Sequence, residues 1–178
     1  MRFVELELPG VAVIEPERLE DNRGFFARLF CEREFAARGL ATRWVQASIS
    51  HNTHKHTLRG MHYQAEPNAE IKLIRCTRGA IHDVLIDLRP QSPTFMRHVA
   101  IELNESNRVM AYVPAGIAHG FLTLAPDTEV FYQMTAFYAP ESARGVRWND
   151  PAFGIEWPSA PSVIHQRDAA YPDFEAAS

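Results

Sequence analysis

Apolar and polar residues alternate with a period of two along most of this chain, which is the pattern of half-buried β-strands. One segment differs. Residues 31–39 mix charged and apolar positions at helical spacing, and Gly39 is suited to end a helix there. Proline, glycine and asparagine separate the short alternating stretches, which predicts an all-β fold, a jelly-roll barrel with one or two short helices. The alternating positions are Val4/Leu6/Leu8, Val11/Val13, Ile71/Leu73, Ile81–Asp87, Val99/Ile101/Leu103 and Val130/Tyr132/Met134.

The length of the chain, 178 residues, predicts one domain over residues 1–178. The segment from about 158 to 178 contains three prolines and is expected to wrap the outside of the barrel. The least charged stretch, 109–126, is broken by proline, glycine and histidine. It is therefore predicted to form two strands around a turn, and no membrane span.

Charge and cysteine content narrow the expected partners and compartment. A net charge of −4 and a pI near 6.1 predict no nucleic-acid partner and no membrane partner, so an anionic ligand would need a local basic pocket. Cys31 and Cys76 match no metal-ligand or disulfide spacing, and the N-terminus lacks the apolar core of a signal peptide. We therefore expect a cytoplasmic protein.

Two polar residues fall on otherwise apolar strand faces and are expected to point into the barrel. Lys72 alternates with Ile74 and Cys76, and Tyr132 lies in the alternating segment EVFYQMT. A buried ammonium is costly unless it is paired or functional, so Lys72 is the more informative of the two. The alternatives are a lysine at the barrel edge that extends to water, and a core tyrosine with a hydrogen-bonded hydroxyl.

Histidines are concentrated in the segment HNTHKHTLRGMHYQ. His51, His54 and His56 lie among polar residues and are predicted to occupy a solvated loop, whereas His62 enters a strand-like run. His119 lies in VPAGIAHGF, whose proline and glycines predict a tight turn at the mouth of the barrel, where side chains often contact ligands. A purely structural role is the alternative for both His62 and His119.

A series of motifs runs in order from Ile14 to Asp168. Together they resemble the dTDP-4-dehydrorhamnose 3,5-epimerases at nearly the family's spacing, whereas any one of them alone is a weak signal. The resemblance implies a cupin-type jelly roll that epimerises a nucleotide-linked 4-keto-6-deoxy sugar. The motifs are DNRGFFARLF, LRGMHYQ, IKLIRCTRGAIHDVLIDLR, SPTF, VPAGIAHGF, the Tyr132 segment, RGVRWNDPAFGIEWP and HQRD.

The resemblance also implies how the reaction proceeds. In a 4-keto sugar the ketone acidifies the protons on C3 and C5, and loss of either gives an enolate. The family's base corresponds to His62, and the carboxylate that orients its ring to Asp168. Lys72 corresponds to the cation beside the enolate oxygen, and Tyr132 to the acid on the opposite face of the sugar. No metal and no cofactor is implied.

Further residues are implied as substrate contacts. Arg59 corresponds to a diphosphate ligand, and His119, Gln46 and Tyr138 to other residues of the same pocket. The family also implies a homodimer, in which the N-terminal strand crosses to the neighbour and Arg23 contributes to the neighbour's site.

Arg59 and His62 present a geometric difficulty, because a regular strand would point them to opposite faces. Gly60 lies between them and could host a β-bulge that turns one side chain around. We therefore predict a bulge at Gly60.

The chain departs from the family on the nucleotide side of the site. Arg28 stands where the family has a glutamate that contacts thymine, Leu19 where it has phenylalanine, and Ser48 where it has asparagine. A guanidinium in place of a carboxylate reverses the hydrogen bonding offered to the base. Arg28 and Ser48 remain candidate substrate-binding residues, and the preferred nucleotide is open.

Two other classes of function compete with an epimerase. The PAGIAH stretch is similar to the second motif of metal-dependent cupins, but Gln64 stands two positions after His62, where such a site needs another ligand. A non-catalytic sugar-nucleotide binding protein is the second rival, although it has no use for an acid and a base on opposite faces. Within the epimerases, inversion of C3, C5 or both stays open, as does another nucleotide sugar.

Overall fold

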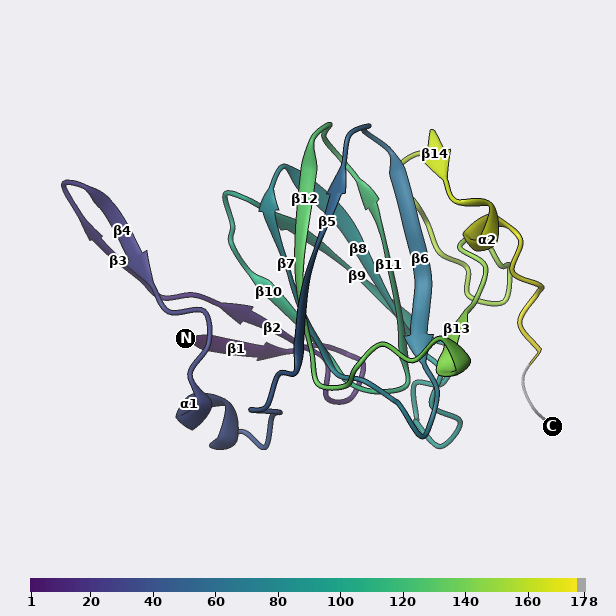
Figure 1. Cartoon of the computed structure of the whole chain (residues 1–178), viewed down its shortest axis with the longest axis horizontal. Coiled ribbons are helices and arrows are strands. Elements are labelled where there is room, and N and C mark those ends of the chain that lie inside the picture. Colours follow the sequence, from purple (N-terminus) through teal and green to yellow (C-terminus); the bar gives the residue numbers. More distant parts are fainter. Residues whose placement is uncertain (176–178) are drawn as a thin grey trace.

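The computed structural model describes residues 1–175; the last three residues of the predicted C-terminal segment, 176–178, lie outside the described part. Two sheets face each other and form a barrel (Figure 1), with every strand pair antiparallel except one. The first sheet has the strand order β1-β2-β10-β7-β12-β5, and the second has β13-β6-β11-β8-β9 with β14 added beside β6. Two short α-helices and one 3₁₀ turn complete the described residues, which confirms the predicted all-β class.

The elements have the following bounds. In the first sheet they are β1 Arg2–Glu5, β2 Ala12–Glu15, β5 Gln46–Asn52, β7 Lys72–Arg78, β10 Met110–Val113 and β12 Thr128–Met134. In the second sheet they are β6 Thr57–Gln64, β8 Ala80–Asp87, β9 His98–Asn104, β11 Ile117–Thr123, β13 Ala143–Gly145 and β14 Val163–Ile164. The rest are the hairpin β3 Arg18–Asp21 and β4 Gly24–Ala27, the helices α1 Glu32–Ala36 and α2 Gln166–Ala169, and the turn η1 Pro140–Ser142.

Strand β8 shows how the alternating pattern builds the core. Ile81 and Leu85 face the first sheet and pack in one buried cluster with residues of β7, β10 and β11. Val84 and Ile86 face the other way and pack against the segment around Val146. Both faces of β8 are therefore buried, which explains its nearly continuous apolar sequence.

The stretch 109–126 forms β10 and β11 around a turn at Pro114–Gly116, as predicted. No helix within residues 1–175 is long and apolar enough to cross a membrane. The predicted first strand is too long, because β1 ends at Glu5. The amide of Leu6 then donates to the carbonyl of Val11, and Leu8 is buried in the turn that this bond closes.

The predicted helix is present but short. It ends at Ala36, and Gly39 follows with a φ of +67°, a conformation that glycine adopts without strain. The amide of Leu40 donates to the carbonyl of Phe35 at 3.0 Å, so Gly39 closes the helix end as predicted, three residues after the last helical one.

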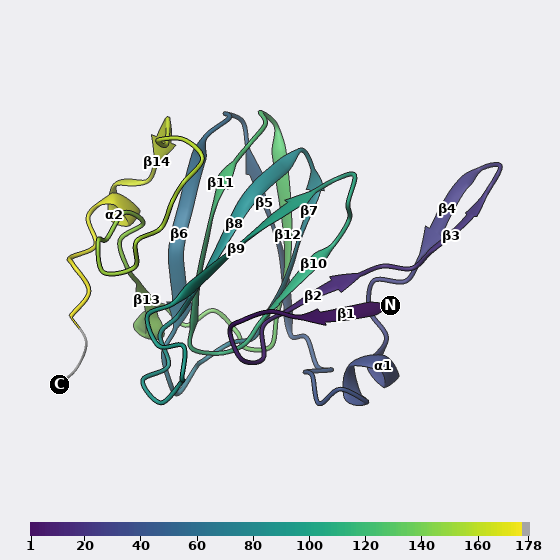
Figure 2. The ribbon, with the colours of Figure 1, turned by 180° about the vertical axis from the view of Figure 1, so that it is seen from behind.

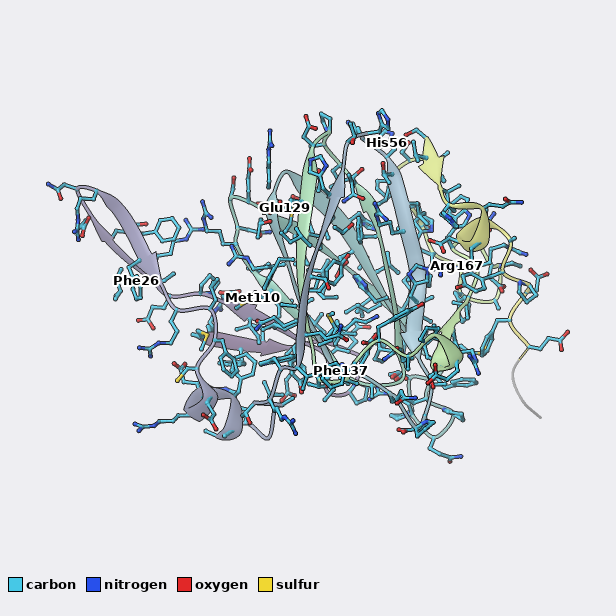
Figure 3. The ribbon with its side chains drawn as sticks, viewed as in Figure 1. Phe26, His56, Met110, Glu129, Phe137 and Arg167 are labelled. Carbon is cyan, nitrogen blue, oxygen red and sulfur yellow. The ribbon has the colours of Figure 1, made fainter. Side chains whose placement is uncertain are left out.

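The hairpin β3–β4 stands away from the barrel (Figures 1 and 2). Several of its apolar side chains are exposed. Phe26 is 68% exposed and points into solvent (Figure 3), and Leu19 is 62% exposed. Phe25 is partly covered by the guanidinium groups of Arg18 and Arg108. An arm with such side chains is suited to contact another surface.

The loop after β8 is held by a buried carboxylate. Asp87 accepts hydrogen bonds from the side chains of Arg89, Ser92 and Thr94 at 2.5–2.8 Å. Burial works to raise the pKa of Asp87, but these bonds outweigh it and lower that pKa to about 2.

The C-terminal segment runs back along the second sheet and lies beside β6 (Figure 2). Strand β14 pairs in parallel with the start of β6, and α2 follows directly. This path brings α2 against β6, at the edge of the space between the sheets.

Candidate active site

A cavity of about 680 Å³ lies between the two sheets, bounded by β5, β6, β7, β11 and β12 and by the C-terminal segment. Most of its lining comes from inward-facing strand positions. Eight of the residues expected from the sequence line it together: Gln46, Arg59, His62, Lys72, His119, Tyr132, Tyr138 and Asp168.

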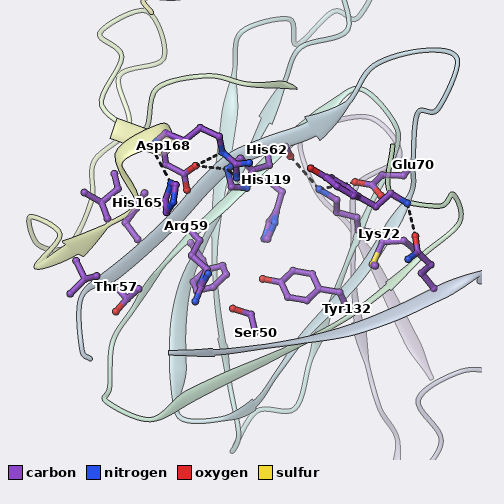
Figure 4. Close-up of a pocket in the computed structure, with 18 residues that line it drawn as sticks. Ser50, Thr57, Arg59, His62, Glu70, Lys72, His119, Tyr132, His165 and Asp168 are labelled. Carbon is purple, nitrogen blue, oxygen red and sulfur yellow. Dashed lines mark hydrogen bonds and ion pairs between the residues drawn. The ribbon is translucent and has the colours of Figure 1, made fainter. Parts of the chain in front are cut away.

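His62 and Asp168 form a hydrogen-bonded pair on one side of the cavity (Figure 4). The Nε2 atom of His62 lies 2.8 Å from Oδ1 of Asp168, and Asp168 is only 2% exposed. The backbone amide of Gly60 donates to Oδ2 of Asp168. A carboxylate opposite Nε2 favours the neutral tautomer that carries its proton there, and in that tautomer the lone pair of Nδ1 can accept another proton.

Asp168 is held in its charged form. Burial works to raise its pKa, but hydrogen bonds from His62, Gly60 and Arg167 outweigh burial, so the pKa of Asp168 lies below its ordinary value. Arg167 also lies near the imidazole, with Nη2 3.4 Å from Nε2 of His62. A fixed carboxylate beside an imidazole stabilises the imidazolium that forms when His62 takes up a proton.

The predicted bulge at Gly60 is confirmed and explains why Arg59 and His62 share the cavity. His62 pairs with His119 and Arg59 pairs with Phe121, so three steps along β6 match two steps along β11. The extra residue reverses the facing of the side chains. Gly60 has a φ of +125°, and a Cβ there would overlap the Cα of Gly120.

Arg59 is fixed at this end of the cavity. Its Nε donates to Oδ1 of Asn52 at 2.7 Å, and one terminal nitrogen reaches the carbonyl of His51 at 3.3 Å. The buried Asn52 is itself anchored to the carbonyl of Thr128. The remaining guanidinium donors are available to an anion.

Tyr132 lies across the cavity from His62, with its ring directed toward the middle (Figure 4). Burial raises the pKa of Tyr132 far above its ordinary value, and the negative charge of Asp83 reinforces the effect. The hydroxyl therefore stays protonated and can donate.

Lys72 is mostly buried, which differs from the alternative of an edge lysine that extends to water. Its side chain is 12% exposed and its ammonium lies 3.2 Å from a carboxylate oxygen of Glu70. It also donates to the carbonyl of His62 at 3.2 Å. The site thus holds a desolvated, paired cation that contacts the backbone of His62.

His119 does not lie in the predicted turn. The turn is at Pro114–Gly116, and His119 is in the interior of β11, where it is 4% exposed. Its Nε2 lies 2.6 Å from Oδ1 of the buried Asp83. The expectation of a solvated loop is also wrong for His51, which belongs to strand β5 although it is exposed.

Three expected substrate-binding residues lie elsewhere in this chain. Arg23 is at the tip of the β3–β4 hairpin and pairs with Asp21. Arg28 follows that hairpin and lies 3.5 Å from Glu34. Ser48 is exposed on β5 and is not among the residues that line the cavity.

The cavity also contains residues that the sequence reasoning missed. Ser50 stands four positions from Gln46 in the same strand, so strand alternation could have found it. Glu70 precedes β7, where alternation does not apply. His165 and Arg167 have no such signal, because they lie in a segment without periodicity. Within residues 1–175, no three His, Cys, Asp or Glu side chains converge as metal ligands.

The sequence profile of the dTDP-4-dehydrorhamnose 3,5-epimerase family matches residues 5–176. The chain belongs to this family. It is 42% identical over 175 residues to the dTDP-4-dehydrorhamnose 3,5-epimerase of Sinorhizobium fredii (strain NBRC 101917 / NGR234), covering 98% of this chain and 90% of that protein.

Solved structures of the epimerase family share the fold closely. The Bacillus anthracis dTDP-4-dehydrorhamnose 3,5-epimerase, solved with TDP and pyrophosphate bound, has a TM-score of 0.93 at 35% identity, covering 97% of this chain and 99% of that one. A 3′-monoepimerase from Streptomyces bikiniensis in complex with dTDP-quinovose has a TM-score of 0.89 at 31% identity, covering 96% and 86%. Epimerases with different stereochemical outcomes thus share this barrel, and the cupin-type jelly roll expected from the sequence is confirmed.

Proposed function

We propose that this family member inverts C3 and C5 of a dTDP-linked 4-keto-6-deoxyhexose by proton transfer, without a metal or cofactor. The observation that carries the proposal is the arrangement of one cavity: a carboxylate-held histidine on one side and a protonated tyrosine across from it. Inversion needs such a pair, because one group must remove a proton from one face and another must return one to the opposite face.

The first half of the reaction falls to His62, Asp168 and Lys72. Nδ1 of His62 takes the proton from the carbon beside the ketone, and the C–H electron pair moves into the ring to form an enolate. The negative charge of Asp168 stabilises the imidazolium. The Lys72 ammonium stabilises the enolate oxygen, in a cavity where water screens the charge little.

The second half falls to Tyr132. Its hydroxyl gives a proton to the carbon from the opposite face, the electron pair of the enolate forms the new C–H bond, and the ketone is restored. The tyrosinate and the imidazolium then return to their starting forms by exchange with solvent. The same two groups can act at C3 and at C5 if the sugar turns in the cavity.

The nucleotide diphosphate is assigned to the Arg59 end of the cavity. The free guanidinium donors of Arg59 suit phosphate oxygens, and Arg167, which also lines the cavity, supplies a second cation. His119, Gln46 and Tyr138 complete the contacts to the substrate. The TDP and pyrophosphate bound by the Bacillus anthracis relative support this ligand class.

The test is solvent-deuterium exchange on dTDP-4-keto-6-deoxyglucose in D₂O, followed by NMR. Deuterium at both C3 and C5 with inversion at both is the expected result. Deuterium at one carbon alone would make the protein a monoepimerase, which is the alternative that the Streptomyces bikiniensis relative favours. Absence of exchange at both carbons would contradict the proposed function.

A different preferred nucleotide is the second candidate, and the replacement of the expected base-reading residues favours it. Arg28 offers only donors where a carboxylate, which only accepts, is expected, and Ser48 is shorter than the expected asparagine. Calorimetric titration with dTDP, UDP, CDP and GDP tests this candidate. Clear selectivity for dTDP would rule it out.

The protein is further proposed to act as a cytoplasmic homodimer built from single-domain chains. The exposed apolar side chains of the β3–β4 hairpin support this, because they need a covering surface, and Arg23 at the hairpin tip would then reach the cavity of the partner. Sedimentation at micromolar concentration should give a dimer, and a monomer would contradict the assignment of Arg23.

A further inference from the structure

The cavity holds an ion pair of which the proposed reaction uses only one member, Lys72. One carboxylate oxygen of Glu70 lies 3.2 Å from the ammonium of Lys72, and the two side chains are only 11% and 12% exposed. Figure 4 shows the pair at the end of the cavity away from His165. A carboxylate is unexpected in a cavity proposed to bind a sugar nucleotide, because its negative charge repels the negative diphosphate of that ligand.

The contacts of Lys72 show what the carboxylate does. An ammonium has three N–H donors. One donates to the carbonyl oxygen of His62 at 3.2 Å, and the ammonium also forms an ion pair with Glu70. Lys72 lines the cavity, so a donor that the His62 carbonyl does not use remains for a ligand.

Glu70 is itself held in place. Its second carboxylate oxygen lies 3.4 Å from the amide nitrogen of Gln64. Gln64 is buried, and its side chain is fixed by bonds with the amide of Ala139 and the carbonyl of Asn68. The chain after Glu70 is pinned as well, because the amide of Ile71 donates to the hydroxyl of Thr135 at 2.9 Å. The Gln64 amide also donates to the carbonyl of Phe137 at 3.2 Å, so its contact with Glu70 is the longest of three. The low exposure of Glu70 and the pinned backbone after it restrict the carboxylate, whereas a lysine alone has many rotamers.

We propose that Glu70 is a positioning residue for the epimerisation: its ion pair holds the Lys72 ammonium so that a free N–H donor faces the enolate oxygen. This inference rests on the proposed function, because it needs an enolate in the cavity. Glu70 offsets the cost of burying the lysine and restricts its rotamers. It does not bind the substrate, since it adds negative charge to a site for an anion.

The proposal predicts a split between kcat and KM. Glu70→Gln keeps the size and removes the charge, so the loss of the ion pair with Lys72 should lower kcat roughly 10- to 100-fold. KM for the sugar nucleotide should stay the same or fall, because a negative charge has left the cavity. Affinity for dTDP, measured by calorimetry, should correspondingly be unchanged or tighter. Binding of dTDP also shows that the variant is folded.

A double-mutant cycle with Lys72→Met tests whether Glu70 acts through the lysine. Glu70→Gln should cost little or nothing in the Lys72→Met background, as measured by deuterium exchange. Glu129→Gln is the matched control. Like Glu70, Glu129 is partly buried, and it accepts a hydrogen bond from Thr77. It lies on β12 (Figure 3) and does not line the cavity. Glu70→Asp keeps the charge and should recover part of the rate.

The outcomes separate this inference from the proposed function. If the unaltered enzyme exchanges deuterium and Glu70→Gln does so at the same rate, Glu70 has no positioning role. A raised KM, or losses that add fully in the double variant, would show that Glu70 contacts the substrate directly and would also overturn the inference. If the unaltered enzyme shows no exchange, the proposed function fails first.

Discussion

Replacing Asp168 with asparagine tests the hydrogen-bonded pair of His62 and Asp168 most sharply. The carboxylate accepts from His62 at 2.8 Å and is 2% exposed, so the change removes a buried charge with almost no change in volume. The amide nitrogen of the introduced asparagine can donate to Nε2, which forces the imidazole proton onto Nδ1. His62 would then lose the lone pair that accepts the substrate proton.

The expected size of the rate loss follows from the interaction with the Asp168 carboxylate that the imidazolium loses. Opposite charges about 4 Å apart at an effective dielectric constant of about 20 interact by about 4 kcal/mol, and this corresponds to roughly a thousandfold in rate. We therefore expect Asp168→Asn to slow deuterium exchange into the substrate by about that factor, with little change in affinity for dTDP, because Asp168 faces the base and not the phosphates.

The control for this variant is Asp150→Asn. Asp150 is also buried, accepts from the amides of Ala152 and Phe174, and lies outside the cavity. Exchange by folded Asp150→Asn protein should be unchanged. Asp168→Asn protein that exchanges as fast as the unaltered enzyme would refute the role of the carboxylate.

Three other changes have defined outcomes. Tyr132→Phe should still remove the substrate proton but should invert poorly, and NMR that shows inversion at the full rate would exclude Tyr132 as the acid. Gly60→Ala should destabilise the fold, because φ is +125° and the new methyl group overlaps Gly120; an unchanged urea midpoint would contradict the bulge geometry. Asp87→Asn should cost about 2 kcal/mol at pH 7 in urea unfolding, because the folded-state pKa of about 2 lies below the ordinary value of 3.8. The contribution of Asp87 is complete above pH 4 or so and disappears as the pH falls through about 2, so the cost should shrink in acid; a cost that is the same at pH 3 and pH 7 would contradict this reasoning.

The sequence predicted the barrel because both the strand period and the turn residues are local. Alternation identified Lys72 and Tyr132 as inward-facing, and the same period would have found Ser50 but not Glu70, which precedes β7. It failed for Leu6 and Leu8, because apolar residues in a buried turn follow the same alternation as residues in a strand.

Other parts of the site depend on contacts that no local pattern encodes. Asp168 reaches His62 only because the segment after β14 folds back along β6, a contact across 106 positions of sequence. His119 looked like a turn residue because of the neighbouring proline and glycines, whereas pairing with β6 and β8 places it inside a strand. The Gly60 bulge could be predicted. Arg59 and His62 would face opposite sides of a regular strand, yet both were expected in one cavity.

Deuterium exchange by His62→Asn tests the central claim most directly. The variant removes the base but keeps a side chain of similar size that can still hydrogen-bond to Asp168. We predict that it binds dTDP as the unaltered enzyme does and that it brings no deuterium into C3 or C5 of dTDP-4-keto-6-deoxyglucose. Deuterium that appears at either carbon at the rate of the unaltered enzyme would show that another group removes the proton.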